Sequence, residues 1–287
     1  MTASALPPQV RRHFVTIGGT RQIHYLRAGA GIPVLLLHPS PGPSRYLADL
    51  IGFLSQHFTV IAPDTPGNGL SDPLPMETPS MDDFGNNVAL FLDALGIKQI
   101  AVYGFHTGAS IGTAFAIRHP DRVLGAILDG FLVETDQSLA DRIAHYLLPF
   151  EPCWDGSHLT WLWDRVRRQE TFAPWYAPTL AHRLDREASS PDRLHRTVMD
   201  WLLSGAEYIK PYSAAFRQRG EQVVHRFSTP TVICAASTDS LAAHLDRLPD
   251  PLPAEVEVIR LGSDQKENHA FFLEQLRRFA AGAAPPP

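Results

Sequence analysis

The stretch QIAVYGFHTGASIGTAFAIR, residues 99–118, decides the fold of this chain. Residues 99–104 form a nearly continuous apolar run, which is typical of a strand buried on both faces of a parallel sheet. A helical pattern begins at Thr107. Gly104 and Gly108 flank the junction, and glycine allows a strand and a helix to meet in a sharp turn. The stretch therefore predicts a strand, a tight turn centred on His106, and a helix.

The same alternation of short apolar runs and helical patterns extends over most of the chain. Gly18-Gly19 predicts the turn of a hairpin between residues 14–17 and 22–26. Further strands are predicted at residues 33–38, 58–64, 123–129, 231–236 and 256–261, and helices at 46–56, 82–95, 107–118 and 269–281. Strands that alternate with helices indicate an α/β fold with a mostly parallel sheet of about eight strands.

One long segment interrupts this alternation. The strand pattern stops near residue 133 and resumes only after residue 226, and all five tryptophans lie between these points. A helical insertion of this size, placed between two strands, predicts a cap over the sheet. We expect residues 1–132 and 222–287 to form the core and residues 133–221 to form the helical cap.

Charge and composition narrow the classes of function. Lys and Arg number 25 against 30 Asp and Glu, so the net charge of −5 argues against binding to nucleic acid or to an anionic membrane. Cys153 and Cys234 are too few for a disulfide framework or a cysteine-rich zinc site. The sequence shows neither a signal peptide nor an apolar run of membrane-spanning length. We expect a cytoplasmic protein whose partner is a small-molecule substrate.

Four landmarks occur in one consistent order along the chain. A buried strand leads into His38-Pro39-Ser40, and a second strand leads into the turn at residues 62–72, APDTPGNGLSD. The third landmark is GFHTG at residues 104–108. The fourth is a pair of residues behind the last two strands, Asp239 and His269.

In this order the landmarks resemble the α/β-hydrolase fold superfamily over nearly the whole chain. Residues 104–108 correspond to its G-x-S-x-G nucleophile elbow, and Asp239 and His269 correspond to its catalytic acid and base. The resemblance implies an oxyanion hole formed by the backbone N–H groups of Ser40 and Thr107. It implies no organic cofactor and no metal. Asp129, at the end of an earlier strand, is the alternative position for the acid.

The sequence departs from the family at the centre of the elbow, where His106 replaces the usual serine, cysteine or aspartate. Thr107 and Ser110 are poor substitutes, because both should point away from the cleft. We expect His106 to act as a base on water or on a substrate proton, with His269 as acid and base and Asp239 orienting His269. Direct attack by the His106 ring on an acyl carbon is the alternative.

The cap and elbow suggest the nature of the substrate. His38 and Phe105 lie beside the catalytic positions, and tryptophans over the cleft would suit an apolar or aromatic substrate with an activated carbonyl; these tryptophans are Trp154, Trp161, Trp163 and Trp175. The favoured activity is hydrolysis through a His-Asp-His constellation.

Three alternatives remain open at the level of sequence. One is a lyase or C–C bond-cleaving enzyme that begins with proton abstraction. Another is a non-catalytic ligand-binding or sensor protein that keeps the cleft. The third is a zinc site built from His38, His106, His269 and Asp239, although the positions of these residues in the fold already account for three of the four.

Overall fold

The computed structural model describes residues 9–149, 151–184 and 188–281. Eight strands form one sheet, in the order β1-β2-β4-β3-β5-β6-β7-β8. The strands are β1 (Arg11–Ile17), β2 (Arg21–Ala28), β3 (Pro33–Leu37), β4 (Thr59–Pro63), β5 (Ile100–Phe105), β6 (Val123–Asp129), β7 (Thr231–Ala236) and β8 (Val256–Leu261). The β1–β2 and β2–β4 pairs are antiparallel, and the other neighbouring strands of the sheet run parallel. The predicted α/β architecture is confirmed.

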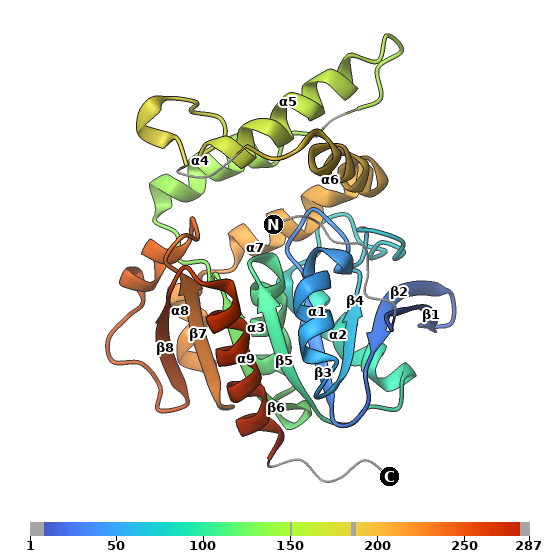
Figure 1. The fold of residues 1–287 in the computed structure, drawn as a ribbon, viewed down its shortest axis with the longest axis vertical. Coiled ribbons are helices and arrows are strands. Elements are labelled where there is room, and N and C mark those ends of the chain that lie inside the picture. Colours follow the sequence, from blue (N-terminus) through green and yellow to red (C-terminus); the bar gives the residue numbers. More distant parts are fainter. Residues whose placement is uncertain (1–8, 150, 185–187, 282–287) are drawn as a thin grey trace.

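Helices cover both faces of this sheet (Figure 1). One face packs against α2 (Met81–Ala94) and α3 (Thr107–Arg118), and the other against α1 (Ala48–Leu54) and α9 (Gln265–Ala280). Consecutive residues of β3 alternate between the two apolar cores, so that Leu35 joins one and Leu36 the other. Because both faces are buried, the strand is apolar at every position, which is the pattern in the sequence.

Among the described residues, five α-helices occupy the interval between β6 and β7, and they are called the cap helices below. They are α4 (Asp136–Tyr146), α5 (Ser157–Thr171), α6 (Pro191–Ser204), α7 (Ile209–Arg217) and α8 (Gly220–Val223). In Figure 1, α4, α5 and α6 lie beyond the carboxyl ends of the parallel strands, and α7 lies between them and α3. The helices α5 and α6 bury apolar residues spaced three or four apart, such as Leu162 with Val166 and Leu194 with Val198. The division of the chain at residues 133 and 221 stays a prediction.

Polar contacts join the cap helices to the core. Arg45, in the short 3-10 helix η1 (Ser44–Leu47), forms an ion pair with Asp200 of α6. Nearby, the Ser204 hydroxyl donates to Asn68 Oδ1 at 3.2 Å. On the opposite side of the cap, the backbone N–H of Val133 donates to Nδ1 of buried His244 at 3.1 Å. The cap is therefore anchored at two separate places.

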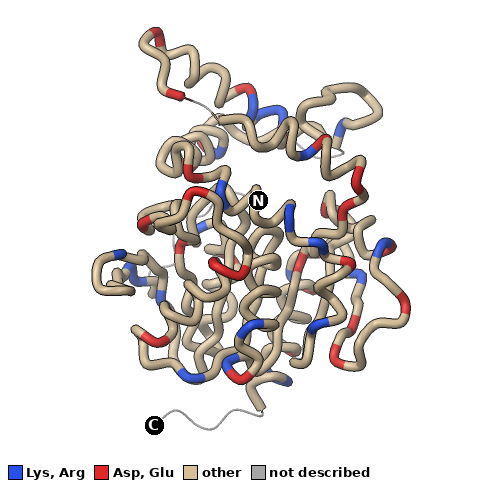
Figure 2. Tube along the Cα trace, turned by 180° about the vertical axis from the view of Figure 1, so that it is seen from behind, with Lys and Arg blue, Asp and Glu red and all other residues tan. Residues whose placement is uncertain are grey.

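Acidic and basic residues are interspersed over both the core and the cap (Figure 2). No helix in residues 9–149, 151–184 and 188–281 combines the length and the apolar character needed to cross a bilayer.

The C-terminal helix begins earlier than the sequence pattern predicts. We expected it from residue 269, but α9 begins at Gln265. The side chain of Asp264 caps its first turn by accepting hydrogen bonds from the backbone N–H groups of Lys266 and Glu267. Only Gly262, Ser263 and Asp264 therefore connect β8 to α9.

Candidate active site

The junction of β5 and α3 forms the sharp turn expected from the sequence. His106 lies at its tip with φ 51° and ψ −112°, and it is the one non-glycine residue with positive φ in the described part of the chain. A Cβ at Gly104 would lie 2.3 Å from the Gly108 carbonyl oxygen, and one at Gly108 would lie 2.1 Å from that of Leu37. Glycine is required at both positions because the strand and the helix approach so closely.

The His106 ring forms a direct hydrogen-bonded pair with Asp239. Its Nε2 lies 2.8 Å from one carboxylate oxygen and 3.0 Å from the other. Asp239 comes from the loop after β7, and the backbone N–H of Leu241 holds its Oδ1 at 2.7 Å. The His106 side chain is 29% exposed and that of Asp239 is 11% exposed. The ring is therefore partly open to solvent, while its carboxylate partner is shielded.

The protonation of this pair follows from its surroundings. Burial favours a neutral Asp239, but the facing His106 ring and the Leu241 N–H outweigh it and hold the pKa of this carboxyl below its ordinary value. An ionised carboxylate only accepts hydrogen bonds, so Nε2 of His106 must carry a hydrogen. In the neutral form of the ring, the lone pair therefore lies on Nδ1, and this nitrogen can take a proton or attack an electrophile.

Neighbouring backbone and rings fix the orientation of the imidazole. The backbone N–H of His106 donates to the Asp129 carbonyl at 2.8 Å. The ring packs over Gly130, where an added Cβ would come within 2.2 Å of the ring carbon Cδ2. Phe105 lies beside the ring, with centroids 4.1 Å apart, and stacks on Tyr46 on its other side. The predicted substrate residue Phe105 therefore adjoins His106, and its role in binding stays a prediction.

His269 does not take part in this arrangement, and its predicted pairing with Asp239 is wrong. It lies in the second turn of α9, where its ring contacts Phe53 of α1 at 5.5 Å between centroids. Burial lowers the pKa of His269, and the charge of Asp49 opposes this shift. Because α9 begins at Gln265, the histidine lies inside a helix that packs on α1 and not in the loop at the carboxyl end of β8. That loop, residues 262–264, contains no histidine.

The two residues expected to donate to the oxyanion, Thr107 and Ser40, follow two neighbouring strands of the sheet, β5 and β3. Thr107 opens α3, and the N–H groups of the first turn of a helix have no acceptor within the helix. Ser40 is buried in the loop after β3, the strand that pairs with β5. Their joint action on a substrate oxygen stays a prediction.

His38 has a structural position, so its prediction as a substrate contact is wrong. The side chain is fully buried, and both ring nitrogens have partners. Nδ1 donates to the Pro39 carbonyl at 2.8 Å, and Nε2 accepts from the Thr65 N–H at 2.8 Å. Burial lowers the pKa of His38, which agrees with a neutral ring that donates once and accepts once. It joins the loop after β3 to the turn after β4.

The four cap tryptophans do not gather into one cluster over the elbow. Trp154 is fully exposed in the segment before α5, so its prediction as a substrate contact is wrong. Trp161 is also exposed, and Trp163 packs against the apolar core of the cap. Trp175 is buried against Arg165. A helical insertion without a regular repeat does not reveal from sequence which aromatic side chains face inward.

Asp129 forms a second, separate polar pair that the sequence did not reveal. It lies buried at the end of β6, and its Oδ2 accepts a hydrogen bond from the Tyr103 hydroxyl at 2.8 Å. Burial raises the pKa of Asp129 to about 7, although the hydrogen bond from Tyr103 opposes the shift. The carboxylate that bonds His106 is Asp239 and not Asp129.

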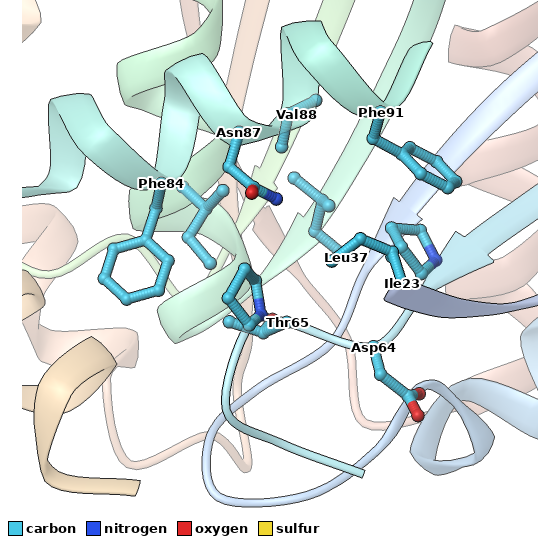
Figure 3. A pocket seen from close by; sticks show the side chains of 11 residues that line it. Ile23, Leu37, Asp64, Thr65, Phe84, Asn87, Val88 and Phe91 are labelled. Atoms are coloured by element: carbon cyan, nitrogen blue, oxygen red, sulfur yellow. The ribbon is translucent and has the colours of Figure 1, made fainter. Parts of the chain in front are cut away.

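A small cavity lies elsewhere in the core. Figure 3 shows it between the turn after β4 and helix α2, lined by Asp64, Thr65 and Asn87 together with apolar side chains. None of the predicted site residues lines it.

The residues considered for a zinc site do not converge. His38 uses both nitrogens, and His269 lies against α1. Within the described ranges, no group of three or more His, Cys, Asp and Glu side chains is arranged to hold a metal ion.

Comparison with known proteins identifies the family. The alpha/beta hydrolase fold family matches residues 32–262, which is most of the chain. The protein belongs to the α/β-hydrolase fold family.

Individual relatives in this family share shorter segments. An uncharacterised hydrolase of Saccharomyces cerevisiae is 34% identical over 119 residues, 41% of each chain. Haloalkane dehalogenase 2 of Mycobacterium tuberculosis is 36% identical over 112 residues, 37% of each chain. Each match spans less than half of the relative's length. The crystal structure of a putative lipase from Acinetobacter baumannii superposes with a TM-score of 0.71, covering 96% of this chain and 93% of the lipase at 14% identity. That likeness concerns the fold alone.

Proposed function

We propose that the protein is a cofactor-free hydrolase in which His106 acts as a general base, oriented by Asp239. The observation that carries the proposal is the bond between Nε2 of His106 and the Asp239 carboxylate, formed at the tip of the elbow. It directs the lone pair to Nδ1, on a ring that remains partly exposed. The similarity to hydrolases, among them haloalkane dehalogenase 2 and a soluble epoxide hydrolase of Corynebacterium, supports hydrolysis as the reaction class.

The reaction can be written with this one ring. Nδ1 of His106 takes a proton from water as the water oxygen attacks an activated carbonyl carbon, and the N–H groups of Ser40 and Thr107 stabilise the oxyanion. The carboxylate of Asp239 balances the positive charge that the ring then carries. The imidazolium returns its proton to the leaving group as the tetrahedral intermediate collapses. One imidazole thus serves as base and then as acid.

The alternative nucleophiles are less well placed. The side chains of Thr107 and Ser110 are buried within the first turns of α3. Neither is bonded to His106 through its side chain, whereas a serine or threonine nucleophile needs a base within hydrogen-bond reach. We therefore assign the chemistry to the ring itself. The substrate class remains the one proposed from the sequence, a small apolar or aromatic compound with an activated carbonyl.

A lyase reaction begun by proton abstraction is the second candidate. It requires one base and no nucleophilic hydroxyl, and the hydrogen bonds of Asp239 to the described residues go to the His106 ring and the Leu241 N–H. Product analysis separates the two reactions, because hydrolysis incorporates oxygen from labelled water and elimination does not.

The test compares turnover of activated esters of apolar and aromatic acids by the wild type, His106→Ala and Asp239→Asn. Removing a general base lowers kcat by about 10²- to 10⁴-fold. Asp239→Asn should also lower kcat strongly, because an amide can donate to Nε2 and leave the ring in the wrong tautomer.

His269→Ala is the control. Its turnover should stay close to that of the wild type, since this ring lies against α1. A His106→Ala variant that keeps full turnover would contradict the proposal. Ligand binding without turnover in the wild type would identify the protein as a non-catalytic member of the fold.

A further inference from the structure

A buried arginine lies at the centre of an aromatic cluster in the cap. Arg165 of α5 is only 2% exposed. Its guanidinium carbon lies 4.0 Å from the ring centroid of Trp175, 4.7 Å from that of Trp201 and 5.4 Å from that of Tyr146. These four residues are called the Arg165 cluster below.

No carboxylate balances this cation among the residues that the structure describes. Nη1 of Arg165 donates to the neutral side-chain oxygen of Gln169. The ionisable groups nearest to it are the tyrosines Tyr146, Tyr208 and Tyr212. Burial lowers the pKa of Arg165, but a guanidinium remains protonated in proteins. The cap therefore encloses a positive charge that is compensated only by aromatic rings and one amide.

Two hydrogen-bond donors of the cluster lack an acceptor among the described residues. They are Nη2 of Arg165 and Nε1 of Trp175, and both are buried. Buried donors are normally bonded, and a buried charge is normally paired. Aromatic faces attract a cation but do not accept its N–H groups in the way that oxygen does. A ligand that accepted from both donors and also balanced the buried cation would carry negative charge.

We propose that the Arg165 cluster is a binding site for a small aromatic carboxylate. A guanidinium binds a carboxylate through two parallel N–H···O bonds, which suits an arginine better than a lysine for this ligand. The indole N–H of Trp175 supplies an additional donor, and the rings of Trp175, Trp201 and Tyr146 favour an aromatic body on the ligand.

Trp175 lies in the segment between α5 and α6. On the inner side, Tyr146 contacts Tyr212 and Phe216 of α7, and α7 packs on α3. Helix α7 therefore separates the cluster from the helix that follows His106 (Figure 1). The binding site does not depend on the proposed catalytic role of His106.

The test measures benzoate binding by isothermal titration calorimetry with the full chain. Arg165→Met removes the charge at similar volume and should weaken benzoate binding at least tenfold. Arg168→Met is the matched control, because Arg168 lies on the same helix, is exposed and pairs with Asp164. It should bind benzoate as the wild type does. Benzamide, which has the same shape and no charge, should bind at least tenfold more weakly than benzoate.

A second variant covers the case in which Arg165→Met does not fold. Arg165→Lys keeps the cation and loses the planar pair of donors, so it should bind benzoate more weakly than the wild type. Benzoate should also change the tryptophan fluorescence of the wild type, because two rings of the cluster are indoles. In Trp175→Phe this fluorescence change should be smaller. The proposal is overturned if the wild type does not bind benzoate, if benzamide binds equally well, or if the Arg165 variants bind as the wild type does.

One further measurement separates this site from the proposed active site. His106→Ala should bind benzoate with unchanged affinity, so a failure of the catalytic proposal leaves this site standing.

Discussion

At the scale of single residues, the proposed base His106 lies at the tip of the elbow and bonds the Asp239 carboxylate directly. The sequence predicted that His106 would lie in the elbow and that Asp239 would be the acid partner in the site. It did not predict the direct hydrogen bond between His106 and Asp239. The histidine that an aspartate bonds depends on the lengths of the loops that carry the two residues. The three residues between β8 and α9 leave His269 in a helix, and Asp239 bonds the elbow ring in its place.

The buried Asp129 leads to a prediction on pH and stability. Its pKa is raised by burial from 3.8 to about 7 in the folded protein. Between these values the folded state binds more protons at this group than the unfolded state does. Its contribution to the free energy of unfolding is therefore fully present below about pH 4 and is lost as the pH rises to about 7. The loss amounts to at most about 4 kcal/mol, because each unit of pKa difference corresponds to about 1.4 kcal/mol.

Asp129→Asn isolates this contribution, because an amide oxygen can still accept the hydrogen bond from Tyr103. Urea unfolding should show the variant gaining stability relative to the wild type as the pH rises from about 4 to 7. The charge of Asp239 is one of the causes of the raised pKa of Asp129, so the difference between the two proteins includes this interaction. If the unfolding free energies of the two proteins changed equally between about pH 4 and 7, Asp129 would not be held neutral in the folded protein.

At the scale of secondary structure, apolar runs and helical periods were sufficient to place most elements. The predicted ranges of α3, β6, β7 and β8 coincide with those in the structure. The start of α9 was missed because its first turn is polar and carries no apolar period. The signal was nevertheless present, since Asp264 followed three residues later by Glu267 is an N-terminal capping pattern.

The elbow gives the prediction at this scale. Gly108→Ala would place a methyl group 2.1 Å from the Leu37 carbonyl oxygen, and backbone cannot move aside as a flexible side chain can. The variant should lose about 1–3 kcal/mol of unfolding free energy, and turnover should fall because β5 and α3 separate. Gly262→Ala is the matched control. No atom lies within 4 Å of a Cβ there and its φ is not positive, so its denaturant midpoint should remain that of the wild type.

At the scale of the whole molecule, the alternation of strands and helices predicted the sheet, whereas the arrangement of the cap could not be predicted. Strand order follows from general rules of connection in parallel sheets. The cap helices pack through side chains whose partners lie far away in sequence, such as Tyr146 with Phe216. Composition alone therefore placed the tryptophans in the cap without showing that Trp154 faces solvent.

The ion pair between Arg45 and Asp200 gives a prediction about cap motion. It is one of the contacts that join α6 to the core, and Asp200 is largely buried. Asp200→Asn removes the charge and weakens a charge-assisted hydrogen bond that contributes about 1.5–3 kcal/mol. Hydrogen exchange in α6 should accelerate by about 10- to 100-fold, with little change in the core strands.

Asp93→Asn provides the comparison for this change. Asp93 pairs with Arg122 at 2.8 Å, but both residues belong to the core and Asp93 is well exposed. Exchange in α6 should be unaffected by this variant. Equal exchange in α6 for Asp200→Asn and the wild type would mean that the remaining contacts, including Ser204 with Asn68, hold the cap on their own.

The short connection of residues 262–264 has a practical consequence. Here the proposed base lies in the elbow, and the segment has only to join a strand to a capped helix. A flexible peptide tag inserted after Gly262 should therefore leave ester turnover intact, which would make this junction an attachment point for a reporter.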